Sequence, residues 1–428
     1  MRVAILSYHF YNSTAEGLAT AKLARAMVGA GHNVAVLTSL DNPLRDARSV
    51  ASSGPLAGIT VHRVGSNGHA TPRWWNWLDR RAMNNGAWDK VCAIPNLVHG
   101  CKAGEWGWIR AVTDQTLRVC DSSGPFDVLH TRLNHPVSHL AGLQVSKRLP
   151  RLPWCAYFSD PWPYHLYPEP YHFTVGPATR YRSEMLLERI LKTAGSYVFP
   201  SERLKDHLLS RGRSKYRGKA FVAPHLAEPW GPLQGRPDRD VLTIRHAGFL
   251  MRERRIEPLY DALRAFLSSK PEVRSSLRVE FLGRYPNGAP PEPPDDLRDV
   301  VRFHGHVSPE AAWDWLQAAD VFLLVEANMK EGIFLPSKLA DYLGGKRPIF
   351  ALSPANGVTA DYLRSGGGVV AQPDDVNGIA GSLARLYELF QQGRLMDLAP
   401  TAGQVCSVSS ERVIPAYERA FQCAIENK

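Results

Sequence analysis

The chain has 428 residues, of which 44% are hydrophobic and 21% are charged, and these fractions are ordinary for a soluble globular protein. The length exceeds what one typical core supports and favours two domains of about 200 residues each. No apolar run approaches the roughly 18 residues that a membrane-spanning helix needs, and the N-terminal MRVAILSYHFYNS lacks the layout of a signal peptide.

The formal net charge of +10 indicates an anionic partner or is a plain solubility effect, and both interpretations stay open. Anionic lipid headgroups and phosphorylated substrates fit the charge. Nucleic acid is not expected, because no helix-turn-helix, zinc-finger or aromatic RNA-binding pattern occurs. The six cysteines are scattered without metal-ligand spacing, which predicts reduced thiols and a cytoplasmic protein.

The first half of the chain alternates strand-like and helix-like segments. Residues 3–8 and 33–39 read as strands around a helix that ends before Gly31, a typical C-terminal glycine. Further strands are expected at 60–64, 127–131, 153–159 and 196–201, with helices around 139–149 and 182–195. This rhythm predicts a parallel, doubly wound sheet.

The composition changes at residues 226–240, which are rich in Pro and Gly and lack hydrophobic periodicity. The alternation then restarts, with strands expected at 241–248, 277–283, 300–305, 320–326, 347–352 and 367–372. We therefore predict an α/β fold with an N-terminal Rossmann-like domain (1–228), a linker (229–240) and a second Rossmann-like domain (241–408). A last helix (409–428) is expected to cross back to the first domain.

The segment PSKLADYLGGKRPIFAL (336–352) opens a helix with a hydroxyl and a lysine. Ser337, Lys338 and the helix dipole are placed to bind a diphosphate, at the strand ends where ligands of parallel sheets bind. Asp341 lies on the same helix face and is suited to a ribose diol. The alternative is that Ser337 caps the helix, Lys338 is solvated and Asp341 complements the dipole.

A second basic element follows the first strand of this domain, in HAGFLMRERRIEP. Gly248 allows close approach of a ligand to the backbone. Arg252, Arg254 and Arg255 follow, and guanidinium groups bind phosphate oxygens bidentately. An exposed run of charges is the alternative.

These segments together resemble the retaining glycosyltransferases of the GT-B fold, in the large family 4 grouping. The resemblance covers nearly the whole chain: AEGLATAKLARAMVGAGHNVAVLT, FVAPH, HAGFL, VRFHGHVSPEAAWDWLQAADVFLL and PSKLADYLGGKRPIFAL. It implies two Rossmann-like domains facing a cleft, a nucleotide-diphosphate sugar as donor, and no metal or further cofactor.

The resemblance also implies site roles. Lys338 and Arg254, with Arg252, would hold the donor diphosphate, and Asp341 would replace the ribose-binding glutamate of the motif. Glu331 or Glu326 would approximate the glutamate that contacts the donor sugar. The sequence departs from the family here, because Glu331 precedes Asp341 by ten residues instead of eight. Phe249 and Arg254 also stand where the family has an Arg-x4-Lys pair.

The first domain offers further candidates. Gly17 resembles the family's glycine beside the donor phosphate, although a turn or packing role fits it equally. Asp160, after a predicted strand, is expected to orient or deprotonate the acceptor hydroxyl, and His130 to hydrogen-bond the donor sugar. Helix capping by Asp160 and a satisfied strand-end histidine are the alternatives.

The stretch HATPRWWNWLDRRAMNNGAWDK combines aromatic and cationic side chains. Arg73, Trp74, Trp75 and Trp77 suit an acceptor surface, a membrane interface or simple packing.

The candidate site residues predict transfer of a sugar to a hydroxyl acceptor without a metal ion, and the resemblance implies retention of the anomeric configuration. A role in polysaccharide biosynthesis, a lipid-linked acceptor and peripheral binding to the inner face of a membrane are expectations. The alternatives are a sugar-nucleotide epimerase of the same fold and a catalytically silent nucleotide-sugar-binding homologue. The base, the sugar and the acceptor stay open.

Overall fold

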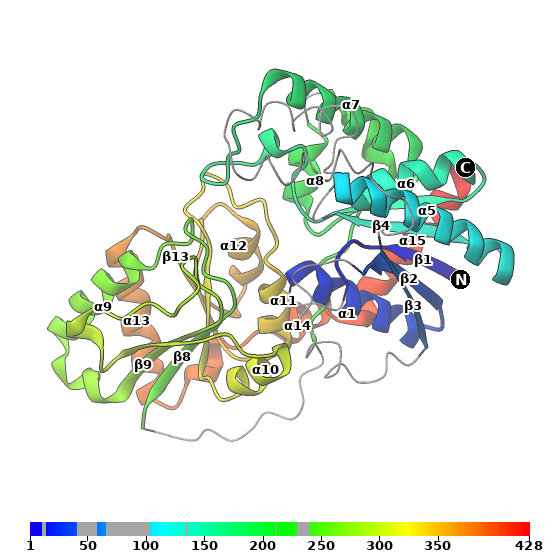
Figure 1. Ribbon diagram of the computed structural model, residues 1–428. Helices are drawn as coiled ribbons and strands as arrows, with labels where there is room; N and C mark the ends of the chain where they lie inside the picture. The colour runs from blue at the N-terminus through cyan, green and yellow to red at the C-terminus, as the bar shows by residue number, and fades with distance from the viewer. Residues whose placement is uncertain (11–13, 41–57, 66–102, 134–135, 211, 229–239) are drawn as a thin grey trace. The chain divides into compact units, whose positions relative to one another are not determined.

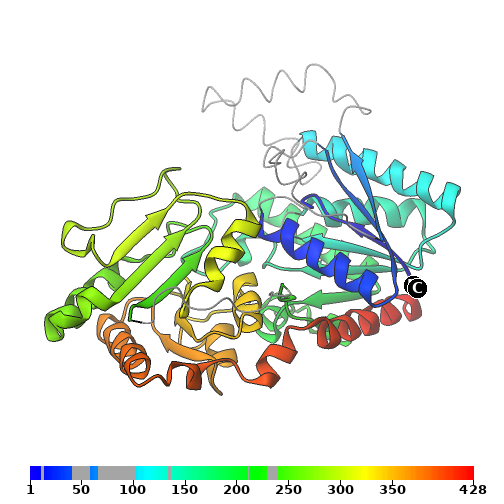
Figure 2. The ribbon, with the colours of Figure 1, turned by 90° about the horizontal axis from the view of Figure 1, so that it is seen from below.

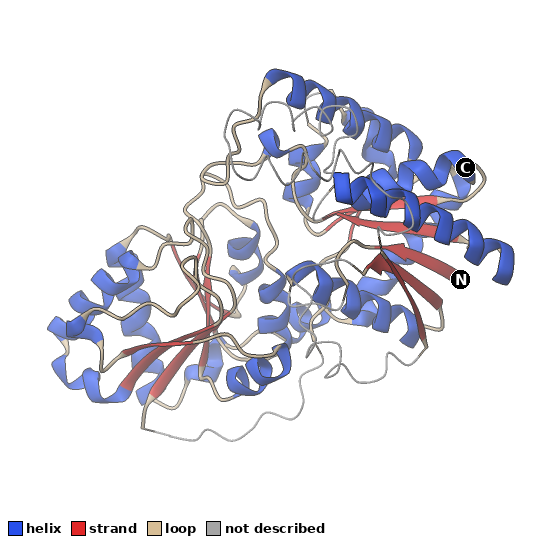
Figure 3. Cartoon of the chain, viewed as in Figure 1, coloured by secondary structure: helices blue, strands red, loops and turns tan. Residues whose placement is uncertain are grey.

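The computed structural model describes residues 1–10, 14–40, 58–65, 103–133, 136–210, 212–228 and 240–428. Within these ranges the chain forms two compact units (Figure 1). Unit 1 comprises Met1–Tyr167, His172–Ala223 and Val413–Lys428, and unit 2 comprises Pro168–Tyr171 and Pro224–Arg412. Each unit is an α/β structure with helices on both faces of its sheet (Figure 3).

The sheet of unit 1 has seven described strands in the order β3-β2-β1-β4-β5-β6-β7, and all of the pairs are parallel. The strands are β1 (Arg2–Leu6), β2 (Asn33–Ser39), β3 (Ile59–Val64), β4 (Val128–Leu133), β5 (Trp154–Phe158), β6 (Ser196–Phe199) and β7 (Ala220–Val222). The strand order reverses between β1 and β4, which is the switch point of a doubly wound sheet.

Helix α1 of unit 1 begins and ends where its sequence indicates. Thr14 caps α1 by accepting a hydrogen bond from the Gly17 amide at 3.1 Å, and Gly31 beyond its C-terminus has φ +84°. The α-helices are α1 (Ala15–Gly29), α5 (Ala103–Ser123), α6 (Val137–Arg148), α7 (Pro177–Thr193), α8 (Glu202–Leu208) and α15 (Ser410–Glu426). Short 3-10 helices span Tyr164–Leu166 and Ser214–Lys219.

The C-terminal helix α15 is part of the core of unit 1 (Figure 2). The carboxylate of Glu418 lies 2.9 Å from Nε2 of His32, and Ser196 Oγ donates to the carbonyl of Ala420 at 2.6 Å. Ala420, Phe421 and the other inward residues of the helix are buried. The last residues of the chain therefore complete the unit that its first residues begin.

Gly195 is a position where α15 packs closely against the rest of unit 1. A Cβ there would lie 2.7 Å from the carbonyl oxygen of Ala424. Gly195→Ala is expected to lower the free energy of unfolding by about 1–3 kcal/mol, because the helix must shift to admit the methyl group. Urea unfolding followed by circular dichroism measures this. Gly218→Ala, whose Cβ would meet no atom within 4 Å, is the control, and equal stabilities of the two variants would contradict the close packing.

The sheet of unit 2 has six described strands in the order β10-β9-β8-β11-β12-β13, again all parallel. They are β8 (Leu242–Ala247), β9 (Leu277–Leu282), β10 (Val301–His304), β11 (Val321–Val325), β12 (Ile349–Leu352) and β13 (Gly368–Ala371). Here the order reverses between β8 and β11.

Alternate residues of these strands pack on opposite faces, as a sheet covered on both sides requires. Leu323 and Phe350 pack with α9 and α13, whereas Phe322 and Ile349 pack with α10, α11 and α12. The helices are α9 (Glu257–Ser269), α10 (Pro309–Gln317), α11 (Ser337–Gly344), α12 (Val358–Leu363), α13 (Val376–Gln391) and α14 (Ala402–Ser407). Short 3-10 helices span Pro271–Ser276, Asp295–Leu297 and Leu395–Leu398.

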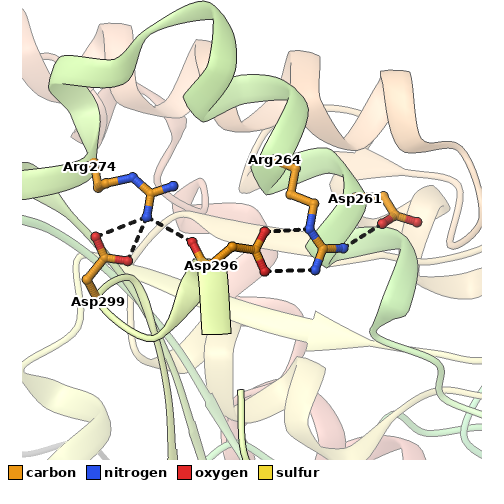
Figure 4. Close-up of polar contacts among 5 residues, drawn as sticks. All are labelled: Asp261, Arg264, Arg274, Asp296 and Asp299. Carbon is orange, nitrogen blue, oxygen red and sulfur yellow. Dashed lines mark hydrogen bonds and ion pairs between the residues drawn. The ribbon is translucent and has the colours of Figure 1, made fainter. Parts of the chain in front are cut away.

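Two arginine–aspartate clusters connect surface segments of unit 2 (Figure 4). Arg264 of α9 lies 2.7 Å from Asp296 and 2.9 Å from Asp261, and Arg274 lies 2.8 Å from Asp299. All of these side chains are substantially exposed, and ion pairs of this kind contribute little to stability. They join the segment around residues 295–299 to α9 and to the 3-10 helix that follows it.

The predicted fold class is confirmed, with both doubly wound sheets present. Strand β7 and helices α5, α8, α12 and α14 were not predicted. The strand predicted at 127–131, with His130 near its end, continues in the structure to Leu133 as β4. His130 therefore lies inside the core, where Tyr417 and Phe421 of α15 cover its ring.

Candidate functional site

The candidate site lies at the carboxyl ends of β8 and β11 in unit 2, on either side of the switch point of the sheet. Three chain segments meet there. The turn after β8 contributes Gly248 and Arg254, the first turn of α11 contributes Lys338, and the end of β11 contributes Glu326. In open parallel sheets this is the position at which ligands bind.

Gly248 and Lys338 are in close contact. Gly248 has φ +135°, a conformation that other residues rarely adopt, and its amide donates to the carbonyl of Leu282 at 2.7 Å. A Cβ at this position would lie 2.1 Å from Nζ of Lys338. The ammonium group therefore rests against the glycine backbone, which a side chain would prevent.

Lys338 is half-buried, and its side chain has no hydrogen bond or ion pair with another described residue. Burial and the neighbouring Arg254 guanidinium lower the pKa of Lys338 to about 7, against the opposing influence of Asp341. A buried cation without a partner is unfavourable in the free protein. An anionic ligand would supply the missing partner.

Arg254 is the second cation of the site. It is half-buried, and its Nε donates to the hydroxyl of Tyr171 at 3.4 Å. The ring of Tyr171 packs edge-on against Phe334, with ring centroids 5.7 Å apart. Arg252, in contrast, is exposed two residues earlier in the turn.

His246 and Glu326 form the buried floor of the site. Burial, then Lys338 and Arg254, hold the pKa of His246 well below its usual value. Nδ1 of this neutral ring lies 2.9 Å from the carbonyl of Leu323, while Nε2 is buried without a hydrogen-bond partner among the described residues. Burial raises the pKa of Glu326, whose Oε2 accepts a hydrogen bond from Ser353 at 2.6 Å.

The other predicted residues of unit 2 lie around this centre. Ser337 is the first residue of α11, after the N-cap Pro336, and makes no capping hydrogen bond. Asp341 is 4% exposed, and its Oδ1 accepts a hydrogen bond from the amide of Glu228 at 2.9 Å, a contact that the sequence did not indicate. Glu331 is exposed, whereas Glu326 is buried beside the cations.

The predicted residues of unit 1 occupy three separate places. The Gly17 amide is engaged by Thr14 at the start of α1. His130 is fully buried in β4, and burial, followed by Arg132, holds its pKa well below the usual value. Asp160 follows β5, accepts a hydrogen bond from Ser159 at 2.8 Å, and is half-buried.

Aromatic side chains gather near Asp160. After burial, the Asp160 carboxylate is among the influences that raise the pKa of Tyr164 to about 12 and the pKa of Tyr167 well above its usual value. The rings of Tyr164, Tyr167 and Phe173 lie 5.2–6.1 Å apart. Arg73, Trp74, Trp75 and Trp77 lie outside the described residues.

The structure thus brings Gly248, Lys338 and Arg254 together as the sequence predicted. Sequence reasoning missed His246 and Tyr171 as their neighbours. The position of His246, two residues before Gly248 in the sequence, could have indicated that it belongs to the site. No feature of the sequence indicated Tyr171, because its segment Pro168–Tyr171 belongs to unit 2 although the residues before and after it belong to unit 1.

Within the described ranges, no group of three or more His, Cys, Asp or Glu side chains is placed to hold a metal ion. None of the helices in those ranges combines the length and the apolar character that a membrane span requires.

The sequence and the fold were compared with those of known proteins. Residues 16–219 match the family model of the glycosyl transferase 4-like domain. No curated protein sequence matches the chain.

Similar solved structures share the fold at low sequence identity. The catalytic domain of starch synthase IV from Arabidopsis thaliana, bound to ADP and acarbose, has a TM-score of 0.64 and 11% identity, covering 100% of this chain and 99% of that one. A sucrose-phosphate synthase from Thermosynechococcus elongatus has a TM-score of 0.60 and 15% identity (99% and 96% covered). A UDP-forming α,α-trehalose-phosphate synthase from Burkholderia vietnamiensis has a TM-score of 0.60 and 11% identity (99% and 100% covered).

Residues 16–219 therefore resemble a glycosyl transferase 4-like domain, and the chain has the GT-B fold that the similar solved structures share.

Proposed function

We propose that the protein transfers a sugar from a nucleoside-diphosphate sugar to a hydroxyl acceptor, with retention of the anomeric configuration. The observation that carries this proposal is the half-buried, unpartnered Lys338 ammonium against the Gly248 backbone, beside Arg254. Two cations and the N-terminus of α11 suit a diphosphate. The similar starch synthase structure contains ADP and the trehalose-phosphate synthase is UDP-forming, which supports this ligand class.

In the proposed reaction Lys338 and Arg254 neutralise the charge that develops on the leaving diphosphate. Such preorganised electrostatic stabilisation is usually the largest contribution to catalysis of this kind. Arg252 and Ser337 lie in the same two segments and would contact the phosphates from the rim. We propose this chemistry without a metal ion or a further cofactor.

Glu326 is our candidate for the carboxylate facing the donor sugar, in place of the exposed Glu331. A ribose-binding role for Asp341 requires the ribose to share or replace its contact with the Glu228 amide. On the acceptor side, we propose that Asp160 of unit 1 orients the acceptor hydroxyl. His130 and Gly17 receive no catalytic role, because the His130 ring is enclosed and the Gly17 amide is engaged.

Incubation of the full chain with a panel of nucleotide sugars tests the proposal, with free nucleoside diphosphate as the readout. We expect slow hydrolysis of one donor, accelerated by a suitable hydroxyl acceptor. An α-linked product from an α-linked donor, observed by NMR, would establish retention. An epimerised donor would instead favour the epimerase alternative, and binding without turnover would favour a silent homologue. A lipid-linked acceptor from polysaccharide biosynthesis belongs in the acceptor panel.

The pKa of Lys338 predicts how donor affinity depends on pH. The ammonium is the form that binds a diphosphate, and with a pKa of about 7 it is lost as the pH rises above neutrality. Affinity for the nucleotide sugar is therefore expected to fall above about pH 7, by up to about tenfold per unit. At a pH where Lys338 is only partly protonated, binding of the nucleotide sugar should be accompanied by uptake of a proton. Calorimetry in buffers of different ionisation enthalpy should detect this uptake.

The exposed Lys330 provides the control for this measurement, since Lys330→Met is expected to leave the pH profile unchanged. A donor affinity that stays constant from about pH 6 to pH 9 would contradict the role given to Lys338.

A further inference from the structure

A cavity of about 360 Å³ lies on unit 1 among helices α5, α6 and α7, which are labelled in Figure 1. It includes none of the residues assigned above. The side chains that line it are Trp106, Leu140, Leu143, Gln144, Lys147, Arg182, Leu186 and Arg189. These residues divide into an apolar part and a cationic part.

The apolar part consists of one tryptophan and three leucines. Leu140, Leu143 and Leu186 are 4–5% exposed, so they form a floor that belongs to the core, and Trp106 is half-buried at its side. A hydrocarbon chain lying on this floor would bury apolar surface on both partners. Among the described residues of the lining, Gln144 is the single uncharged residue with a polar side chain, so the hydroxyl groups of a sugar or nucleoside would find few partners here.

The cationic part consists of Lys147 of α6 and of Arg182 and Arg189 of α7. No carboxylate is among the described residues that line the cavity. The side chains of Lys147 and Arg189 make no hydrogen bond or ion pair with another described residue. Lys192 lies on α7, like Arg189, but outside the cavity, and it differs in having Glu188 as an ion-pair partner at 3.7 Å.

We propose that this cavity binds an amphipathic anion, with a phosphate group at Lys147, Arg182 and Arg189 and a hydrocarbon chain on Trp106 and the three leucines. Charge and shape both support this class of ligand. A phosphate without a chain leaves the apolar floor empty, and a neutral chain leaves Lys147 and Arg189 unmatched. A membrane lipid and a soluble alkyl phosphate share this chemistry.

Binding of decyl phosphate below its micelle concentration, measured by calorimetry on the full chain, tests the proposal. We expect saturable binding that is about tenfold weaker in the double variant Lys147→Gln/Arg189→Gln. The control is Arg148→Gln/Lys192→Gln, which removes the same charge from the same two helices outside the cavity and should bind like the wild type. Inorganic phosphate and decanol, each supplying half of the ligand, should bind far more weakly.

The proposal is overturned if decyl phosphate shows no saturable binding, or if the two double variants lose affinity equally. Circular dichroism of both variants confirms that they fold, as expected for exposed side chains. Sedimentation with vesicles of phosphatidylglycerol or phosphatidylcholine then identifies the source. Binding to the anionic vesicles that the cavity variant loses indicates a membrane lipid, whereas binding of decyl phosphate alone indicates a soluble ligand. Nucleotide-sugar turnover by the cavity variant reports separately on the proposed function.

Discussion

Replacement of Lys338 by methionine is expected to reduce nucleotide-sugar turnover by at least about 100-fold, the loss typical of removing one preorganised group that stabilises developing charge. Methionine retains the apolar stem and most of the volume, so the contact with Gly248 changes little. The variant should unfold at the same urea concentration as the wild type or a higher one, because a poorly solvated cation has been removed.

Steady-state kinetics and urea unfolding of the same preparations measure both effects. Lys330→Met is the matched control, since Lys330 is an exposed lysine in the loop that leads to α11, and it should leave turnover unchanged. Retention of both donor affinity and turnover by Lys338→Met would refute the proposed function.

Arg132→Met is expected to destabilise unit 1 by about 3–5 kcal/mol, the loss typical of breaking a buried charged network. Arg132 is 2% exposed at the end of β4. Its Nε donates to Thr20 at 2.9 Å, it donates to the Tyr417 hydroxyl at 3.2 Å, and its guanidinium lies 4.1 Å from the centre of the Tyr157 ring. The buried carboxylate of Glu16 interacts with it electrostatically.

A double-mutant cycle separates the charge from the packing. Glu16→Gln in the Arg132→Met background should recover part of the lost stability, because a neutral side chain at position 16 does not depend on the positive charge of Arg132. Urea unfolding gives the four free energies. If the effects of the two substitutions add without coupling, the electrostatic interaction between Arg132 and Glu16 is not the source of the loss.

Much of the fold could be predicted because its signals are local. Short apolar runs, separated by segments with helical periodicity, located most of the strands in both sheets. Gly31 marked the end of α1. Strand β7 was missed because its three residues, Ala220–Val222, are too short for a periodic signal. Lys338 and Gly248 could be paired in advance because each follows a strand of one parallel sheet, and parallel strands end at the same edge.

The parts of the site that could not be predicted depend on contacts between distant residues. The amide that Asp341 binds belongs to Glu228, 113 positions away. The enclosure of His130 depends on α15 at the far end of the chain, so a histidine that reads as a strand-end ligand becomes a core residue. Neither the periodicity nor the spacing of residues around these positions carries that information.

The incorporation of α15 into unit 1 has a consequence for biosynthesis. Residues 1–223 leave the ribosome well before α15, yet Phe421 and Tyr417 of that helix cover His130 and supply one of the hydroxyl partners of Arg132. Unit 1 therefore keeps an open apolar face until α15 has been translated, while residues 224–412 are free to fold before it.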